Sequence, residues 1–135
     1  MKKVLATIAF SALTAFLCIG ALCGPDPVSS SKKLELLSPR SGSFTVGSTV
    51  AITFKSNSTA VSQVIAHVTL DNGKIWKDVA AAGVAPSAGT ISWIVGDEYA
   101  APAYATGTNK VKIRVADYYD ETINDVSDTI TVLNP

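Results

Sequence analysis

The chain has little cysteine. Its two cysteines, Cys18 and Cys23, lie inside or at the edge of an apolar N-terminal segment. The remainder of about 110 residues therefore offers no cysteine for a disulfide, a CxxC redox pair or a thiolate metal site. A domain of this size can still fold without such links, because it buries roughly two-thirds of the surface that its unfolded chain exposes.

Histidine and net charge are also scarce. His67 is the only histidine, so no second one exists for a metal pair or a catalytic relay. Alternation with its apolar neighbours predicts that it lies on the outward, solvent-facing side of a strand. Without Lys2 and Lys3 of the leader, nine basic side chains stand against eleven acidic ones, a net charge near −2. This balance gives no basic field for phosphates and argues against nucleic acid as a partner.

The first 23 residues are typical of an export signal. Two lysines precede an apolar run over residues 4–17 that is short for a membrane span. Residues 20–23 loosely resemble a bacterial lipobox, although Leu22 stands where that motif has a small residue. Two outcomes stay open: a lipid on Cys23, giving a cell-envelope or outer-membrane lipoprotein, or cleavage after Cys23, giving a secreted protein. Residues 24–33 are rich in Pro and Ser and predict a flexible tether.

From Leu34 the chain is a series of short extended runs divided by turn signals, and no helical period of useful length appears. The best of these runs, residues 63–70, is followed by Asp71-Asn72-Gly73 and predicts a β-hairpin. Trp76 and Trp93 are in phase with apolar neighbours and are expected in the core. The other runs with alternation or apolar character cover residues 34–37, 50–55, 91–95, 111–115 and 130–132. About seven short strands predict an all-β sandwich over residues 34–135.

Several short motifs resemble a known family. They are Leu37-Ser38-Pro39, Gly42, Val46-Gly47-Ser48-Thr49-Val50, Val68-Thr69-Leu70-Asp71-Asn72-Gly73 with Trp76, Ser92-Trp93, Arg114-Val115 with Asp117, and Val126-Ser127-Asp128. In this order they are similar to the Ig-like domain at the N-terminus of yeast Ser/Thr-rich, GPI-anchored cell-wall proteins linked to β-1,6-glucan assembly, also found in secreted bacterial proteins. The resemblance implies an Ig-like or fibronectin III-like antiparallel β-sandwich and a cell-surface setting. It transfers no catalytic residues.

Acidic side chains are the first candidates for chemistry. No GxSxG motif and no glycine-rich phosphate loop is present. Asp97 and Glu98 are expected to be exposed loop acids, which ordinarily stay ionised and do not supply the raised pKa that glycoside hydrolysis needs. A second group could bind calcium, because hard cations prefer several oxygens from a compact loop. Its members are Asp117, Asp120, Glu121 and Asp125. The alternative is a turn-forming and solubilising role. No resident cofactor and no enzymatic activity are expected.

Aromatic loop residues are the other candidates. Successive loops of an antiparallel sandwich alternate between its two ends, so the Tyr118-Tyr119 loop should share its end with the loop over residues 57–62 and lie opposite Tyr99 and Tyr104. Tyr118 and Tyr119 are therefore a candidate sugar-stacking site, against the alternative of a solvated turn with one ring folded on the core. The sequence predicts a non-catalytic binding or adhesion module of the cell envelope, with polysaccharide or a surface protein as partner. The alternative is a structural spacer or assembly subunit that contacts neighbouring surface proteins.

Overall fold

The computed structural model describes residues 31–98 and 104–135, and this part of the chain is all-β. It contains nine strands, one short 3-10 helix, Pro86–Ala88, and no α-helix. None of its helices is long and apolar enough to cross a membrane. The strands are β1 Leu34–Ser38, β2 Gly42–Thr45, β3 Thr49–Ser56, β4 Val64–Thr69, β5 Lys77–Asp78, β6 Thr90–Ile94, β7 Gly107–Asp117, β8 Asn124–Val126 and β9 Ile130–Asn134.

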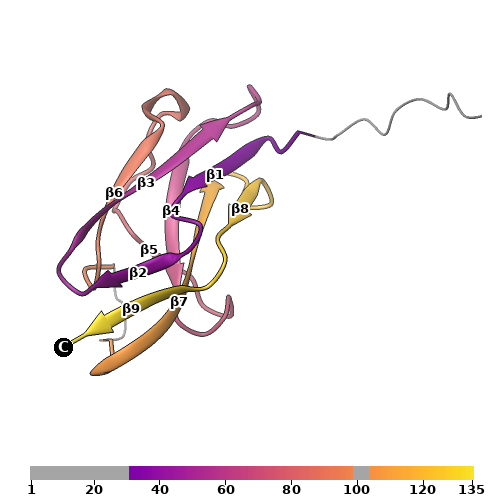
Figure 1. Ribbon diagram of the computed structural model, residues 1–135. Coiled ribbons are helices and arrows are strands. Elements are labelled where there is room, and N and C mark those ends of the chain that lie inside the picture. The colour runs from indigo at the N-terminus through magenta and orange to yellow at the C-terminus, as the bar shows by residue number, and fades with distance from the viewer. Residues whose placement is uncertain (1–30, 99–103) are drawn as a thin grey trace, which may run out of the picture. The chain divides into compact units, whose positions relative to one another are not determined.

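The strands form two sheets that pack as a sandwich (Figure 1). The smaller sheet has the order β1-β3-β6, and the larger has the order β2-β9-β7-β4-β5, with β8 also paired to β7. Strand β7 is the centre of the larger sheet, because β4 pairs along one side of it while β8 and β9 pair in succession along the other. The predicted all-β sandwich is confirmed, while β2 and β8 are additional to the expected strands.

One pairing departs from the expected antiparallel arrangement. Strand β2 runs parallel to β9, with Gly42 opposite Ile130 and Phe44 opposite Val132. The chain reaches this position by leaving the smaller sheet after β1 and joining the larger one. Gly42 makes the crossing with a φ of 126°, a backbone conformation that favours glycine. The prediction of a wholly antiparallel sandwich is therefore wrong at this edge.

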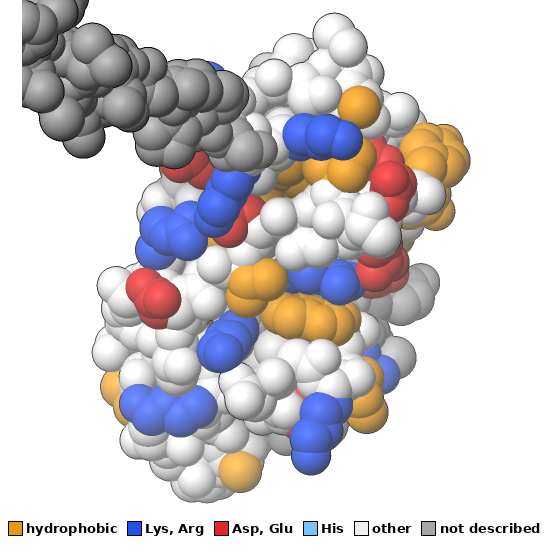
Figure 2. Space-filling view, turned by 90° about the vertical axis from the view of Figure 1, so that its right-hand side faces the viewer, with side chains coloured by type: hydrophobic (Ala, Val, Ile, Leu, Met, Phe, Trp, Pro, Cys, Tyr) orange, Lys and Arg blue, Asp and Glu red, His pale blue; other side chains and the backbone are white. Residues whose placement is uncertain are grey.

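The surface of the sandwich carries charges of both signs. Figure 2 shows Lys and Arg side chains interspersed with Asp and Glu side chains, with apolar groups between them. The face in this view has no large region of one sign, in keeping with a near-neutral composition.

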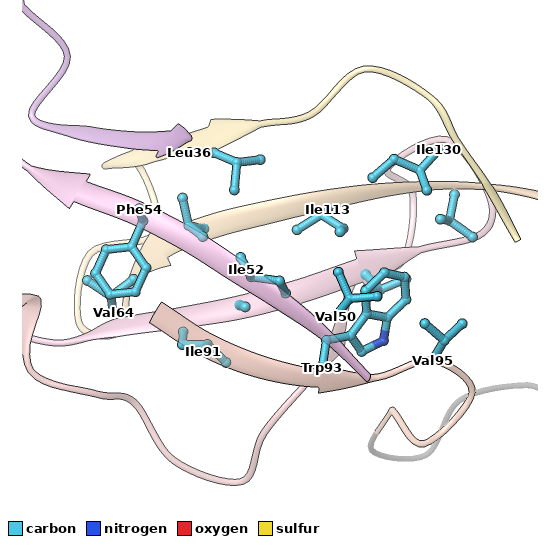
Figure 3. Close-up of a cluster of buried hydrophobic side chains, with 14 of the residues drawn as sticks. Leu36, Val50, Ile52, Phe54, Val64, Ile91, Trp93, Val95, Ile113 and Ile130 are labelled. Atoms are coloured by element: carbon cyan, nitrogen blue, oxygen red, sulfur yellow. The ribbon is translucent and has the colours of Figure 1, made fainter. Parts of the chain in front are cut away.

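The core lies between the sheets and is built mainly from alternate residues of β1, β3, β4, β6, β7 and β9 (Figure 3). Trp93 is its largest fully buried side chain, and the ring of Phe44 meets it edge-on at a centroid distance of 6.3 Å. The prediction that Trp93 is a core residue is confirmed. The other fully buried large side chains are Leu34, Leu36, Ile52, Ile113, Ile130, Val64, Val68, Val95, Val111, Val115 and Val132.

The predicted hairpin is present as β4 and β5, joined by residues 70–76. Asn72 and Gly73 have φ values of 61° and 93°, as the turn signal requires. The loop is longer than a two-residue turn, and it brings Trp76 to the outer face of the sheet. There Trp76 is half-buried beneath the Arg114 guanidinium, 4.7 Å from the ring centroid. The prediction that Trp76 belongs to the core is therefore wrong.

Candidate functional site

Tyr118 and Tyr119 form an exposed aromatic pair just beyond the end of β7. Tyr118 is 47% exposed and Tyr119 is 72% exposed. Their ring centroids are 5.1 Å apart and their planes meet at 80°, an edge-to-face contact of the kind that aromatic rings prefer. Neither ring is buried in the core, so the pair presents aromatic surface to solvent.

Asp117 organises this end of the sandwich. Its side chain is only 1% exposed, and both carboxylate oxygens accept backbone N–H groups. Oδ2 accepts from Ser62 at 2.6 Å and from Gln63 at 3.4 Å. Oδ1 accepts from Tyr119 at 3.0 Å and from Asp120 at 2.9 Å. One carboxylate thus holds two loops that are far apart in the sequence.

The loop over residues 57–62 and the Tyr118-Tyr119 loop share one end of the sandwich, as the sequence predicts. Besides the Asp117 contacts, the N–H of Tyr118 donates to the carbonyl of Gln63 at 2.9 Å. Val61 is buried and anchors the first loop to the core. The aromatic pair therefore stands on a fixed base.

The pKa of Asp117 is lowered by this environment. Burial on its own raises the pKa, but the backbone N–H groups of Ser62, Tyr119, Asp120 and Gln63 stabilise the charged form and outweigh it. Asp117 is therefore an anion at neutral pH, and its oxygens are already engaged by the chain.

Asp125 has a separate set of partners at the start of β1. Its carboxylate accepts from Lys32 Nζ at 2.5 Å, from Arg40 Nη1 at 2.9 Å and from the N–H of Leu36 at 3.0 Å. Burial raises its pKa, while the hydrogen bonds from Lys32 and Arg40 lower it, and the net shift is downward. Asp125 therefore holds the chain that enters β1 against β8.

The two remaining acids of the group are also engaged. Glu121 Oε2 accepts from Arg114 Nη2 at 2.7 Å, and Asp120 Oδ1 accepts from the hydroxyl and N–H of Thr122. Within residues 31–98 and 104–135, no group of three or more His, Cys, Asp or Glu side chains could hold a metal ion. The structure does not bring Asp117, Asp120, Glu121 and Asp125 together as calcium ligands, because each has its own partners.

His67 is only 3% exposed, so the prediction that it faces solvent is wrong. It does lie on the outer side of β4, but neighbouring side chains cover that side. Its Nδ1 accepts from Arg114 Nε at 3.4 Å, which leaves Nε2, 3.3 Å from Asp78 Oδ1, to donate. Burial and then the positive charge of Arg114 lower the pKa of His67. The ring is therefore neutral at pH 7 and holds a position within the sheet.

Glu98 is also buried, contrary to the expectation of an exposed loop acid. Its Oε1 accepts from Trp93 Nε1 and from the Tyr104 hydroxyl, both at 2.7 Å, and from the N–H of Gly96 at 3.2 Å. Burial and the Glu98 carboxylate raise the pKa of the Tyr104 phenol. Among the residues described, Oε2 of Glu98 has no hydrogen-bond partner. Tyr104 is thus a buried anchor, while Tyr99 lies outside the described residues.

Residues 1–30 lie outside the described part of the chain, and with them the predicted export signal, the candidate lipidation site Cys23 and most of the predicted tether. Comparisons with protein-family models, with curated proteins and with solved structures returned no match. The fold and the exposed aromatic pair, defined by their own geometry, are therefore the basis for a functional proposal.

Proposed function

We propose that this chain is a non-catalytic binding or adhesion module of the cell envelope, with an Ig-like sandwich that presents Tyr118 and Tyr119 to a polysaccharide. The observation that carries the proposal is an exposed pair of aromatic rings on a loop that a buried carboxylate joins to the neighbouring loop. The export signal and the tether expected from the sequence agree with such a setting.

Two properties of the pair suit a sugar ligand. A sugar ring has an apolar C–H face that packs on an aromatic ring, and the phenol hydroxyls can exchange hydrogen bonds with sugar hydroxyls. The loops are held through Asp117, so little conformational entropy is lost when a ligand orders the surface. A rigid aromatic surface of this kind favours binding over a solvated turn without function.

A glycan array with the parent and two double variants tests the proposal. We expect the double variant Tyr118→Ala, Tyr119→Ala to bind the glycan at least about tenfold more weakly than the parent, as for aromatic anchors at other interfaces. Tyr118→Phe, Tyr119→Phe keeps the rings and should retain most of the affinity if stacking dominates. Ile94→Ala, which trims an exposed apolar side chain on the other sheet, is the matched control. No glycan signal from the parent would reject polysaccharide as the ligand.

A structural spacer or assembly subunit is the second candidate, and one observation favours it. Strand β6 pairs only with β3 among the described strands, which leaves one side of it available to a strand of a neighbouring protein. Cross-linking on intact cells, read together with the glycan array, separates the two candidates. A spacer gives protein adducts at β6, whereas an adhesion module gives a signal on the glycan array.

Anchoring at Cys23 is part of the same proposal. A lipid there would hold the module at the membrane through the tether over residues 24–33, with no membrane span. Secretion after ordinary cleavage is the alternative.

A further inference from the structure

A hollow lies where the end of β4 and the loop after it meet the middle of β7, away from the tyrosine pair. It has a volume of about 310 Å³. It is lined by Thr69, Leu70, Asp71, Asn72, Lys110, Val111, Lys112 and Thr129. Lys112 and Tyr118 are six residues apart along the chain, which is about 20 Å in an extended strand. A ligand in the hollow therefore need not touch Tyr118 or Tyr119.

The lysines reach the hollow because side chains alternate along β7. Val111 and Ile113 are buried in the core, so Lys110, Lys112 and Arg114 project from the opposite face. Neighbours on that face lie about 7 Å apart. The face of β7 thus carries three cations in a row, which is an unusual concentration in a chain of nearly balanced charge.

The first two of these cations are not neutralised by the chain. Arg114 pairs with Glu121 at 2.7 Å, whereas Lys110 and Lys112 form no ion pair with any described residue. Lys110 Nζ donates to the Thr131 hydroxyl at 2.8 Å, a bond that leaves two of its three donors for a ligand. The two lysines therefore offer positive charge to whatever enters the hollow.

The one acid in the lining is turned toward its own loop. Asp71 Oδ1 accepts from the Thr69 hydroxyl at 2.7 Å and from the N–H groups of Lys74 at 3.0 Å and Ile75 at 2.9 Å. Two lysines against one engaged carboxylate leave the hollow with a net positive charge. Exposed Asn72 and Thr129 add an amide and a hydroxyl for further hydrogen bonds.

An aromatic ring lies next along the same face. Arg114 stacks on Trp76, and Trp76 packs against Gly73, where an added Cβ would lie 3.5 Å from the ring. Trp76 comes from the same loop as Asp71 and Asn72, so one loop supplies both the ring and part of the lining of the hollow. Ammonium groups, hydrogen-bonding side chains and an aromatic edge together suit a ligand that has carboxylates, hydroxyls and apolar sugar faces.

We propose that this face of β7 binds a carboxylate-bearing polysaccharide. Lys110 and Lys112 pair with the carboxylates of its uronate units, and Asn72 and Thr129 bond to hydroxyls. A neighbouring sugar packs on the part of Trp76 that Arg114 leaves uncovered. This site is independent of the tyrosine pair, and it differs in being sensitive to salt because its main contacts are exposed charge pairs.

The test measures the binding of polygalacturonate by three proteins. They are the parent, the double variant Lys110→Gln, Lys112→Gln, and a control double variant, Lys33→Gln, Lys55→Gln. The control removes the same charge from exposed lysines elsewhere. We expect binding by the parent at low salt that weakens as sodium chloride is added. The first variant should bind about tenfold more weakly, while the control changes less than about twofold. Thermal melting checks that both variants are folded.

Two further ligands complete the experiment. Dextran, a neutral polymer, should not bind at this face, and Lys110→Gln, Lys112→Gln should leave any glycan signal of the tyrosine pair unchanged. The proposal is overturned by a parent that does not bind polygalacturonate or by equal losses in the two lysine variants. It is also overturned by equal binding of polyphosphate, which would indicate unselective attraction of polyanions.

Discussion

Removal of the Asp117 carboxylate is the most informative perturbation of the fold, because one buried side chain joins two loops. Asp117→Ala deletes the acceptor for the N–H groups of Ser62, Gln63, Tyr119 and Asp120. Asp117→Asn keeps the size but replaces one oxygen with an NH₂ group, which cannot accept from either loop.

The magnitude follows from the four bonds. A hydrogen bond contributes about 1 kcal/mol net, and more when its acceptor is charged. Four lost bonds therefore suggest about 4 kcal/mol, reduced toward about 3 kcal/mol because water reaches some of the freed loop N–H groups. Asp117→Asn should lose at least the two bonds of one oxygen, about 2 kcal/mol. Either loss is a large part of the free energy of unfolding of a typical domain, about 5 to 15 kcal/mol.

Urea denaturation at several pH values measures these changes, with Asp128→Ala as a matched control for loss of an exposed acid. The pKa of Asp117 is lowered in the folded state. Its contribution to stability is therefore fully present above the pKa of the unfolded chain, about 3.9, and is lost as pH falls through the pKa of the folded state. The difference in free energy of unfolding between the parent and Asp117→Asn should therefore narrow below about pH 4. An Asp117→Asn variant within about 0.5 kcal/mol of the parent at pH 7 would refute the reasoning.

Three further predictions concern other parts of the chain. Trp93→Ala should cost about 3 to 5 kcal/mol in urea denaturation, since it empties the centre of the core and removes a donor to Glu98, and a parent-like midpoint would contradict this. His67, whose folded pKa is lowered by burial and by Arg114, should make the parent lose stability as pH falls below about 6.5, and His67→Gln should flatten that dependence in melting curves. Mass spectrometry of the mature protein should find a diacylglyceryl group on Cys23, whereas a free N-terminus at Gly24 would exclude the anchor.

The strands that the sequence predicts are those with their own alternation. Val50, Ile52 and Phe54 mark β3 without reference to any partner, and they are buried as the period of two requires. Strand β2 has four residues and β8 has three, and each exists because a longer strand supplies its hydrogen bonds. Local pattern cannot reveal a strand whose stability comes from a partner distant in the sequence.

Alternation also tells which side of a sheet a residue occupies, but not whether that side is covered. His67 was expected on the outer side and lies there, yet Arg114 and Asp78 enclose it. The acids near the end of β7 illustrate the same limit. Asp125 is close to Asp117 in sequence, but its partner Lys32 is 93 residues away. Proximity in sequence suggested a shared cation, whereas the fold provides a separate partner for each carboxylate.

The parallel pairing of β2 with β9 has a mechanical consequence. When the chain is pulled from residues before β1 and after β9, these two parallel strands are drawn in opposite directions along their length. Their hydrogen bonds, from Gly42 opposite Ile130 to Thr45 opposite Leu133, then carry the load together instead of opening one at a time. We expect the sandwich to resist extension along this axis until the whole β2–β9 ladder shears at once, a property that would suit a domain held under tension at a surface.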